Sequence, residues 1–345
     1  MSDLIEDLLA GDHRALARTI TKLENREPGY RDLVKQLHTH TGGADVIGIT
    51  GSPGAGKSTL VDKMAERYRD RGLTVGVIAI DPSSPFTGGA VLGDRIRMAS
   101  NVGDMDVFFR SMSARGSLGG LSTATTDAVK ALDAFGKDKI IIETVGAGQN
   151  EVDIVRTADT VAVLVPPSSG DDVQMLKAGI LEIGDVFVVN KADLEGATRT
   201  VSELEEMVHM REGSFEVDAG HHAPGNVEIE IDDGTDEERE TWSPPVLETV
   251  AKTGDGLDEF LDTLESHRDY LERTGRLSEK ARTRYAEEIR TLLRADARDM
   301  VDAELQARGG LDAYVDAVLD RETDPYTVAD EVLGPLRECV EERRE

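Results

Sequence analysis

Residues 51–58 read Gly-Ser-Pro-Gly-Ala-Gly-Lys-Ser and carry the clearest chemical signal in the sequence. They match the pattern GxxxxGK[ST], and they stand between an apolar run and a helical pattern, as a phosphate-binding loop requires. Glycines let backbone N–H groups approach a phosphate closely, and the start of the following helix adds positive potential. We expect Lys57 to contact the β- and γ-phosphates of a nucleotide and Ser58 to coordinate Mg²⁺. The residues expected to line the nucleotide here are Gly51, Ser52, Pro53, Gly54, Ala55, Gly56, Lys57, Ser58 and Thr59.

A second motif, NKAD at residues 190–193, directly follows another apolar run and bears on the choice of base. The Asp193 carboxylate can accept hydrogen bonds from guanine N1 and N2, whereas adenine offers no such pair of donors. Asn190 is expected to brace the loop, and the Lys191 side chain is expected to lie over the base. Backbone N–H groups expected to contact guanine O6 belong to Val250, Ala251 and Lys252. The two motifs together predict a guanine nucleotide site.

Acidic side chains between these motifs are the candidates for the Mg²⁺ shell. Glu143 ends an apolar run and Gly146 follows three residues later, a spacing typical of a metal-associated carboxylate and a glycine that contacts the γ-phosphate. Asp81 also ends an apolar run, and Asp94 follows it along the chain. Because ligands of α/β proteins bind at the carboxyl ends of strands, we expect these acids to hold Mg²⁺ together with Ser58. The alternative for each acid is a solvated position in a loop.

The elements that would position these residues alternate along the chain. The predicted strands lie at residues 46–50, 74–80, 107–109, 140–142, 161–165, 186–189 and 246–250. Helical patterns separate most of them, and one helix is expected to start near Lys57. Apolar strands that alternate with helices indicate an α/β fold with a mainly parallel sheet and helices on both faces. We therefore expect the architecture of a P-loop NTPase.

Three regions are expected along the chain. A helical N-terminal extension covers residues 1–44, a P-loop domain covers residues 45–256, and a helical region covers residues 257–345. An acidic segment at residues 212–240 interrupts the P-loop domain, and we expect it to be a solvated insertion or hairpin. The C-terminal helices either pack onto the core or form a dimerisation arm, because their apolar positions must be buried somewhere.

Composition excludes several classes of function. The formal net charge is −29, which argues against nonspecific binding to nucleic acid, because such binding needs a positive field. No apolar run approaches the roughly 20 residues that span a bilayer. The acidic start of the chain does not resemble a signal peptide, and we expect a cytoplasmic protein without a membrane partner. A single cysteine, Cys339, excludes an internal disulfide and a cysteine-rich metal site.

Beyond these motifs, the sequence resembles the MeaB/ArgK family of GTPases, the methylmalonyl-CoA mutase-associated proteins related to human MMAA. The stretches that carry the resemblance are GSPGAGKSTL at 51–60, AIDPSSPFTGGAVLGDRIRM at 79–98, RGSLGGLS at 115–122, ETVGAGQNEVDI at 143–154, AGILEIGDVF at 178–187, VVNKAD at 188–193 and DPY at 324–326. They extend over nearly the whole chain. The resemblance implies a nucleotide-binding α/β core, a helical N-terminal extension and a helical C-terminal region that forms a homodimer.

The resemblance also implies roles for three further segments. It assigns residues 81–94 to a first switch and the Mg²⁺ shell, and residues 143–154 to a second switch. Residues 170–177 resemble a third switch through which a partner enzyme stimulates hydrolysis, and this makes Gln174 and Lys177 candidate catalytic residues.

Members of this family act as chaperones for an adenosylcobalamin-dependent acyl-CoA mutase. They couple GTP hydrolysis to cofactor loading and to the protection or reactivation of the mutase. The resemblance therefore implies GTP hydrolysis with Mg²⁺, with methylmalonyl-CoA mutase or a related mutase and a cobalamin adenosyltransferase as partners. Adenosylcobalamin would belong to the partner enzyme. Two alternatives stay open: a GTPase that inserts a metal such as nickel into an enzyme, and a transport-linked small-molecule kinase of the kind implied by the ArgK label.

Overall fold

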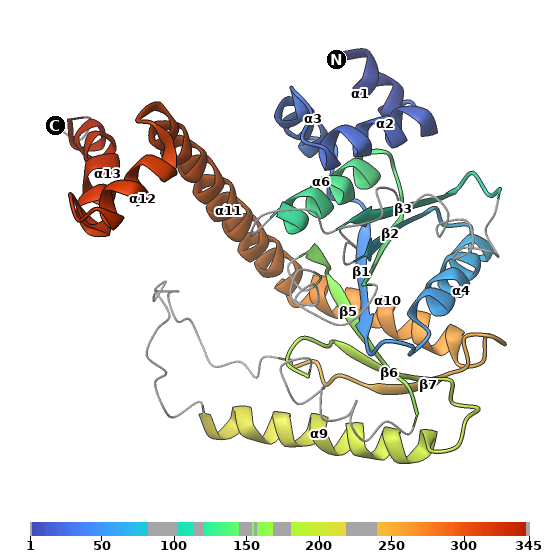
Figure 1. Cartoon of the computed structure of the whole chain (residues 1–345). Helices are drawn as coiled ribbons and strands as arrows, with labels where there is room; N and C mark the ends of the chain where they lie inside the picture. Colours follow the sequence, from blue (N-terminus) through green and yellow to red (C-terminus); the bar gives the residue numbers. More distant parts are fainter. Residues whose placement is uncertain are drawn as a thin grey trace. The chain divides into compact units, whose positions relative to one another are not determined.

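The computed structural model describes residues 2–81, 103–113, 120–144, 154, 157–167, 181–218 and 240–342. It divides the chain into two compact units, residues 1–281 and 282–345 (Figure 1). The boundary lies further along the chain than the position after residue 256 that the sequence suggested. The reason is helix α10 (Leu257–Arg273), which buries Phe260, Leu261 and Leu264 in the core of the first unit.

A seven-stranded parallel sheet forms the centre of the first unit, with the order β3-β2-β4-β1-β5-β6-β7 (Figure 1). The strands are β1 (Asp45–Gly51), β2 (Val75–Asp81), β3 (Val107–Ser113), β4 (Lys139–Thr144), β5 (Thr160–Val165), β6 (Val186–Asn190) and β7 (Val246–Thr249). The predicted α/β fold with a parallel sheet is thus confirmed. Strands β1, β5 and β6 are buried along their whole length, which explains why the sequence shows them as continuous apolar runs.

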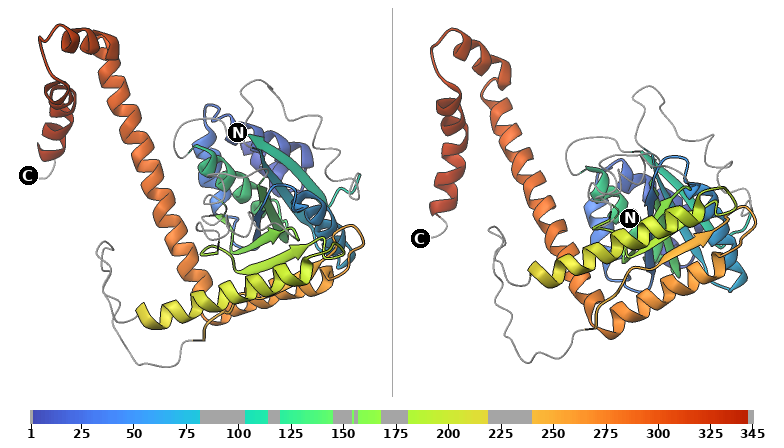
Figure 2. Two further views of the ribbon diagram at one scale, coloured as in Figure 1. Left: turned by 60° about the horizontal axis from the view of Figure 1, so that its bottom comes forward. Right: turned by 90° about the horizontal axis from the view of Figure 1, so that it is seen from below.

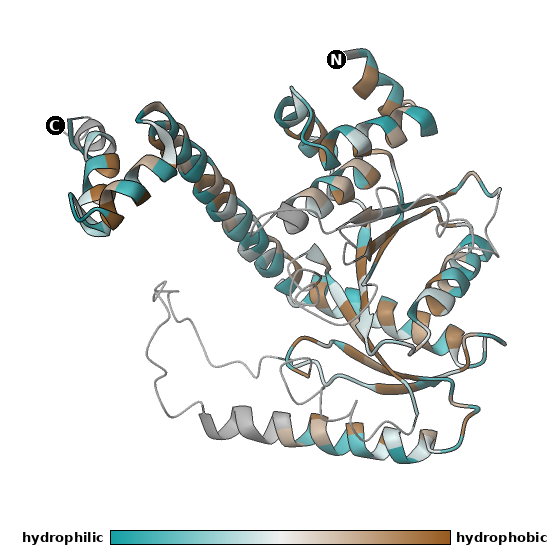
Figure 3. Ribbon diagram, in the orientation of Figure 1, coloured by the Kyte–Doolittle hydropathy of each residue, from teal (hydrophilic) through white to brown (hydrophobic). Residues whose placement is uncertain are grey.

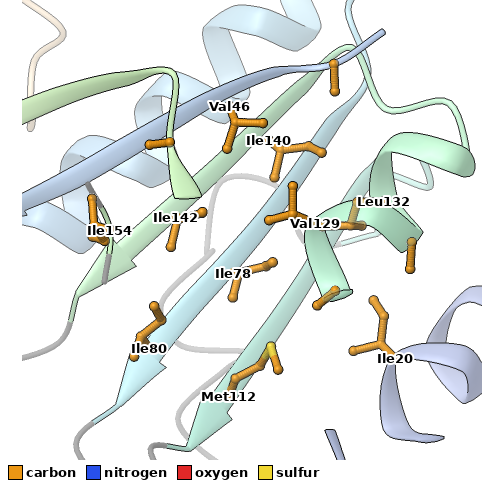
Figure 4. Close-up of a cluster of buried hydrophobic side chains, with 14 of the residues drawn as sticks. Ile20, Val46, Ile78, Ile80, Met112, Val129, Leu132, Ile140, Ile142 and Ile154 are labelled. Atoms are coloured by element: carbon orange, nitrogen blue, oxygen red, sulfur yellow. The ribbon is translucent and has the colours of Figure 1, made fainter. Parts of the chain in front are cut away.

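Helices cover both faces of this sheet (Figures 1 and 2). On one face, α4 (Lys57–Asp70) and α10 pack against a layer that includes Ile141 of β4. On the other face, α6 (Gly120–Ala134) contributes Val129 and Leu132 to a layer that contains Ile140 (Figure 4). Neighbouring residues of a strand enter different layers because successive side chains point to opposite faces.

The N-terminal helices form an outer layer on α6 (Figure 1). They are α1 (Ser2–Leu9), α2 (His13–Glu24) and α3 (Tyr30–His38). Leu16 and Ile20 of α2 are fully buried in the same layer as α6. An ion pair of 2.6 Å between Arg110 of β3 and Glu24 joins this layer to the edge of the sheet. Residues 1–44 are therefore built into the first unit.

Helix α9 (Ala197–Asp218) packs against strands β6 and β7 and buries Leu204 and Val208. It also corrects where the acidic insertion begins, because residues 212–218, expected in a solvated insertion or hairpin, are the last turns of α9. Glutamate is a good helix former, so acidity alone does not predict a loop. The remainder of that insertion, residues 219–239, lies outside the described residues.

The second unit consists of the later part of α11 (Arg276–Ala307), α12 (Gly310–Leu319) and α13 (Pro325–Glu342). None of the residues of α11 is buried. Large apolar side chains that the unit exposes are Tyr285, Ile289, Leu292, Leu293, Met300, Leu311, Val315, Leu319 and Tyr326. Apolar and polar positions alternate along these helices (Figure 3). Among the described residues, no helix is long and apolar enough to cross a membrane.

Candidate functional site

The phosphate loop connects β1 to α4, as the sequence predicts, and its lysine is held inside the loop. The Lys57 ammonium donates hydrogen bonds to the carbonyl oxygens of Gly51 at 2.6 Å and Ser52 at 3.0 Å. The lysine is only 7% exposed although it carries a charge. Phosphate oxygens are stronger acceptors than carbonyl groups for an ammonium donor, so a bound nucleotide can replace these partners.

Two glycines of the loop are required by their neighbours. A Cβ at Gly51 would lie 2.0 Å from the carbonyl oxygen of Leu164, and a Cβ at Gly56 would lie 2.5 Å from Nδ2 of Asn190. Both residues also have positive φ values, 130° and 93°, which side chains disfavour. The pattern of glycines therefore reflects close approaches to β5 and to the NKAD loop.

Asn190 joins the phosphate loop to the two segments expected at the base. Its Nδ2 donates to the carbonyl oxygen of Ala55 at 2.7 Å, and its Oδ1 accepts from Thr249 Oγ1 and from the N–H of Ala251, each at 3.1 Å. The side chain is 1% exposed, so this network is shielded from water. Lys191 adds a hydrogen bond of 2.8 Å to the carbonyl oxygen of Gly54.

Asp193 lies in the turn that follows these contacts, and it is exposed. The adjacent loop after β7 has already used two of its three candidate donors, because Val250 N–H donates to the Asp255 carbonyl and Ala251 N–H donates to Asn190. Lys252 is the residue of the three whose N–H has no protein acceptor among the described residues. The structure thus brings the predicted base-binding loops beside the phosphate loop.

A hydroxyl and a carboxylate meet where β4 ends beside the start of α4. Ser58 Oγ donates to Glu143 Oε1 at 3.2 Å, and Glu143 is 1% exposed. Oxygen atoms of this kind suit Mg²⁺, which takes few protein ligands and keeps phosphate and water oxygens in its shell. No group of three or more His, Cys, Asp or Glu side chains that could hold a metal occurs in the part of the chain that the structure describes. The pair therefore fits a metal that arrives with a nucleotide.

The structure does not describe the side chains of the other residues predicted to hold Mg²⁺, to contact the γ-phosphate or to take part in partner stimulation. Asp81 is the last residue of β2, at the same carboxyl edge of the sheet, and its side chain is not described. Asp94, Gly146, Gln174 and Lys177 lie outside the described residues.

Sequence reasoning missed Thr50 and Thr144, and it missed the side-chain contact of Thr249, the residue that begins the segment expected at guanine O6. Thr249 donates its hydroxyl hydrogen bond to Asn190, and the hydroxyl groups of Thr50 and Thr144 bond to each other. The available signal is positional, since each threonine is at or next to the carboxyl end of a strand that leads into a predicted motif.

The amino-terminal ends of the strands, opposite the phosphate loop, hold α10 through buried polar contacts. Arg268 of α10 pairs with Asp159 at 3.0 Å, and the next residue back, His267, bonds through Nδ1 to Thr160 Oγ1 at 2.8 Å. Burial lowers the pKa of His267 from 6.5 to about 4, and the nearby Asp185 carboxylate only partly offsets this effect. The Trp242 ring lies 4.7 Å from the imidazole between centroids, at a tilted angle, and its Nε1 donates to the carbonyl oxygen of Asp185 at 2.8 Å. This end of the sheet is a structural anchor, remote from the phosphate loop along each strand.

The chain is similar to known proteins over nearly its whole length. A protein of Pyrococcus abyssi whose name describes it as a GTPase is 49% identical over 337 residues, which cover 97% of both chains. GTPase ArgK of Escherichia coli is 32% identical over 294 residues, which cover 84% of this chain and 82% of that protein.

A solved structure and a family model agree with these relatives. The crystal structure of the LAO/AO transport system kinase has the same fold, with a TM-score of 0.64 at 24% identity and 97% of each chain covered. Residues 16–306 match the family described as methylmalonyl Co-A mutase-associated GTPase MeaB. The chain therefore belongs to the MeaB family of P-loop GTPases.

Proposed function

We propose that this GTPase is a chaperone for an adenosylcobalamin-dependent acyl-CoA mutase, with methylmalonyl-CoA mutase as the first candidate. The observation that carries the proposal is the match of residues 16–306 to a family named for its association with that mutase. GTP hydrolysis would gate the loading of adenosylcobalamin into the mutase and support its protection or reactivation. A cobalamin adenosyltransferase is the proposed third partner, and the cofactor itself would stay with the mutase.

The nucleotide would bind across the loops that Asn190 joins. Its phosphates would lie along residues 51–59, with the Lys57 ammonium moving from the loop carbonyls to the β- and γ-phosphates. Its base would lie between Lys191 and the loop after β7, with the Asp193 carboxylate accepting from guanine N1 and N2. The short contacts from Asn190 and Lys191 to the carbonyls of Ala55 and Gly54 support this arrangement, because they bring both loops to one place.

Ser58 and Glu143 would hold Mg²⁺, and Asp81 and Asp94 would complete its protein shell. The metal neutralises charge on the phosphate oxygens in reactions of this type. Lys57 and the N–H groups of the loop would add fixed positive charge where negative charge develops. Gly146 would contact the γ-phosphate, and Gln174 and Lys177 would be the route by which the partner stimulates hydrolysis.

The second unit would serve as a dimerisation arm. Support comes from its exposed apolar side chains and from α11, which buries none of its residues within one chain. An apolar helix face of this kind gains stability when another protein surface removes it from water. A second copy of the chain is the proposed occupant.

The test is phosphate release from GTP by the purified chain, with and without methylmalonyl-CoA mutase from the same organism. We expect slow release alone and a clear acceleration by the mutase. Lys57→Ala should abolish release in both conditions, whereas Lys63→Ala, a lysine of the same helix that pairs with Glu66, should behave as wild type. No acceleration by the mutase would refute the chaperone proposal. Nucleotide consumption that requires a small-molecule acceptor would instead indicate a kinase.

A further inference from the structure

Two buried threonines lie side by side at the carboxyl ends of β1, which leads into the phosphate loop, and β4, which carries Glu143. The hydroxyl oxygens of Thr50 and Thr144 are 3.1 Å apart, and the two residues are 0% and 1% exposed. The β1–β4 register pairs Ile49 with Glu143. Thr50 and Thr144 are the next residues in these two strands. Gly51, the first residue of the phosphate loop, comes directly after Thr50.

The hydroxyl pair and the carboxylate occupy opposite faces of the sheet. In β4, Ile141 belongs to the layer with α4, and Ile142 belongs to the layer with α6 (Figure 4). Since side chains alternate along a strand, Glu143 points to the α4 side, where it meets Ser58, and Thr144 points to the α6 side. The hydroxyl pair therefore fixes the same strand end from the face behind the carboxylate.

A second contact strengthens this attachment to β1. The side chain of Ile154 is fully buried, and its Cγ2 fills the space beside Gly48, where a Cβ would come within 2.4 Å. Gly48 is two residues before Thr50 and so lies on the same face of β1. Thr144 and Ile154, which begin and end the intervening stretch of chain, are thus both attached to β1.

We propose that Thr50 and Thr144 are positioning residues for the Mg²⁺ site, and that their hydrogen bond holds the Glu143 carboxylate against Ser58. This inference rests on the proposed role of Ser58 and Glu143 toward the metal. Neither threonine would touch the metal or the nucleotide. Groups that orient metal ligands typically contribute about 10- to 100-fold to metal affinity or activity. Water cannot replace a missing hydroxyl group at a site that is closed to solvent.

Four variants of the pair isolate the hydroxyl groups from packing. Thr50→Val and Thr144→Val keep the side-chain shape and remove one hydroxyl each, while the double variant removes both and leaves no unpaired hydroxyl. Thr144→Ser keeps the hydroxyl and loses a methyl group. Thr19→Val is the matched control, because Thr19 is 0% exposed in the α2 layer and its hydroxyl has no hydrogen-bond partner among the residues that the structure describes.

The primary measurement is the dissociation constant of Mn²⁺ for the complex with GDP, followed by the EPR signal of the free ion. The second is the Mg²⁺ concentration that gives half-maximal GTP hydrolysis. We expect both values to rise about tenfold in each Val variant. The double variant should be no worse than either single one, because one shared bond is lost. Thr144→Ser and Thr19→Val should stay close to wild type.

Three results would overturn the inference, and the last can be distinguished from the first two. Wild-type metal binding in Thr50→Val and Thr144→Val, or an equal loss in Thr144→Ser, would refute the hydroxyl pair alone. A wild-type protein that hydrolyses GTP without any divalent metal would refute the proposed metal site and the inference with it.

Discussion

At the scale of residues, hydrogen bonds from side chains to the backbone carbonyl oxygens of the phosphate loop hold the site together. Lys57 donates to two carbonyls of the phosphate loop, Lys191 donates to a third and Asn190 donates to a fourth. These donors leave few carbonyls of the loop without a partner, and each contact restrains its backbone. A nucleotide would therefore meet a loop that is already formed, which lowers the entropy cost of binding.

Gly56 gives a residue-scale prediction about that preformed loop. In Gly56→Ala the new methyl group would lie 2.5 Å from Asn190 Nδ2, so the Asn190–Ala55 hydrogen bond should break. We expect the nucleotide-free protein to lose about 2 kcal/mol of unfolding free energy in urea titrations. Gly54→Ala is the matched control, because Gly54 also has a positive φ, 78°, but its Cβ would meet nothing within 4 Å. Equal losses in the two variants would show that backbone strain, and not the Asn190 contact, sets the effect.

The sequence indicated candidate residues for this site but not the contacts among them. A phosphate loop and an NKAD motif have fixed spacing because their backbone must wrap around a ligand, so Lys57, Asn190 and Asp193 could be identified from order alone. Thr50 and Thr144 could not, because their bond depends on which strands become neighbours. Nothing local in a single strand contains that information.

At the scale of elements, α10 runs from the carboxyl ends of the strands, where the candidate site lies, to their amino ends. Its N-terminus follows the loop that contains Ala251 and Lys252, and its C-terminal half is anchored by Arg268 and His267 at the amino ends of the strands. The sequence assigned α10 to a separate helical region, because helical periodicity does not reveal which surface a helix covers. The apolar stripe of α10 packs against the sheet. The helix therefore belongs to the first unit, which extends to residue 281.

His267 makes the anchor of α10 sensitive to pH. The folded protein keeps the imidazole neutral down to a pKa of about 4, whereas the unfolded chain takes up the proton near 6.5. The unfolded state therefore binds more protons between these values, and unfolding free energy should fall by about 3 kcal/mol as the pH drops from 6.5 to 4. Urea titrations at pH 7 and pH 5 should show about 2 kcal/mol of this loss in wild type. The same loss is expected in His38→Gln, which replaces an exposed histidine. His267→Gln should show a smaller loss, and a loss equal to that of wild type would contradict the assignment.

At the scale of the whole molecule, two units with different burial share one chain. The first unit contains nearly all of the buried apolar residues. The second unit exposes large apolar side chains on α11, α12 and α13. Helix existence was predictable here from periodic Leu and Val positions. The partner of their apolar faces was not, since a sequence shows that a face needs cover without showing what covers it.

The proposed dimer gives a prediction at this scale. Ile289 and Leu293 lie one turn apart on α11 and are 57% and 63% exposed. Replacing both with Glu would put charges into the proposed interface, where burial without partners is costly. We expect light scattering to give the mass of a dimer for wild type and of a monomer for the double variant. Met105→Glu, at a 64% exposed apolar residue of the first unit, should remain dimeric. A monomeric wild type would rule out the arm.

The most direct test of the whole account is the choice of base at Asp193. Calorimetric titration of the wild type should give at least 100-fold tighter binding of GTP than of ATP, because an unpaired carboxylate penalises adenine. In Asp193→Asn, the amide N–H can donate to the C2 carbonyl of xanthine, so XTP should become the preferred nucleotide. Equal affinity of the wild type for ATP and GTP, or an unchanged preference for GTP in Asp193→Asn, would contradict the guanine site on which the account depends.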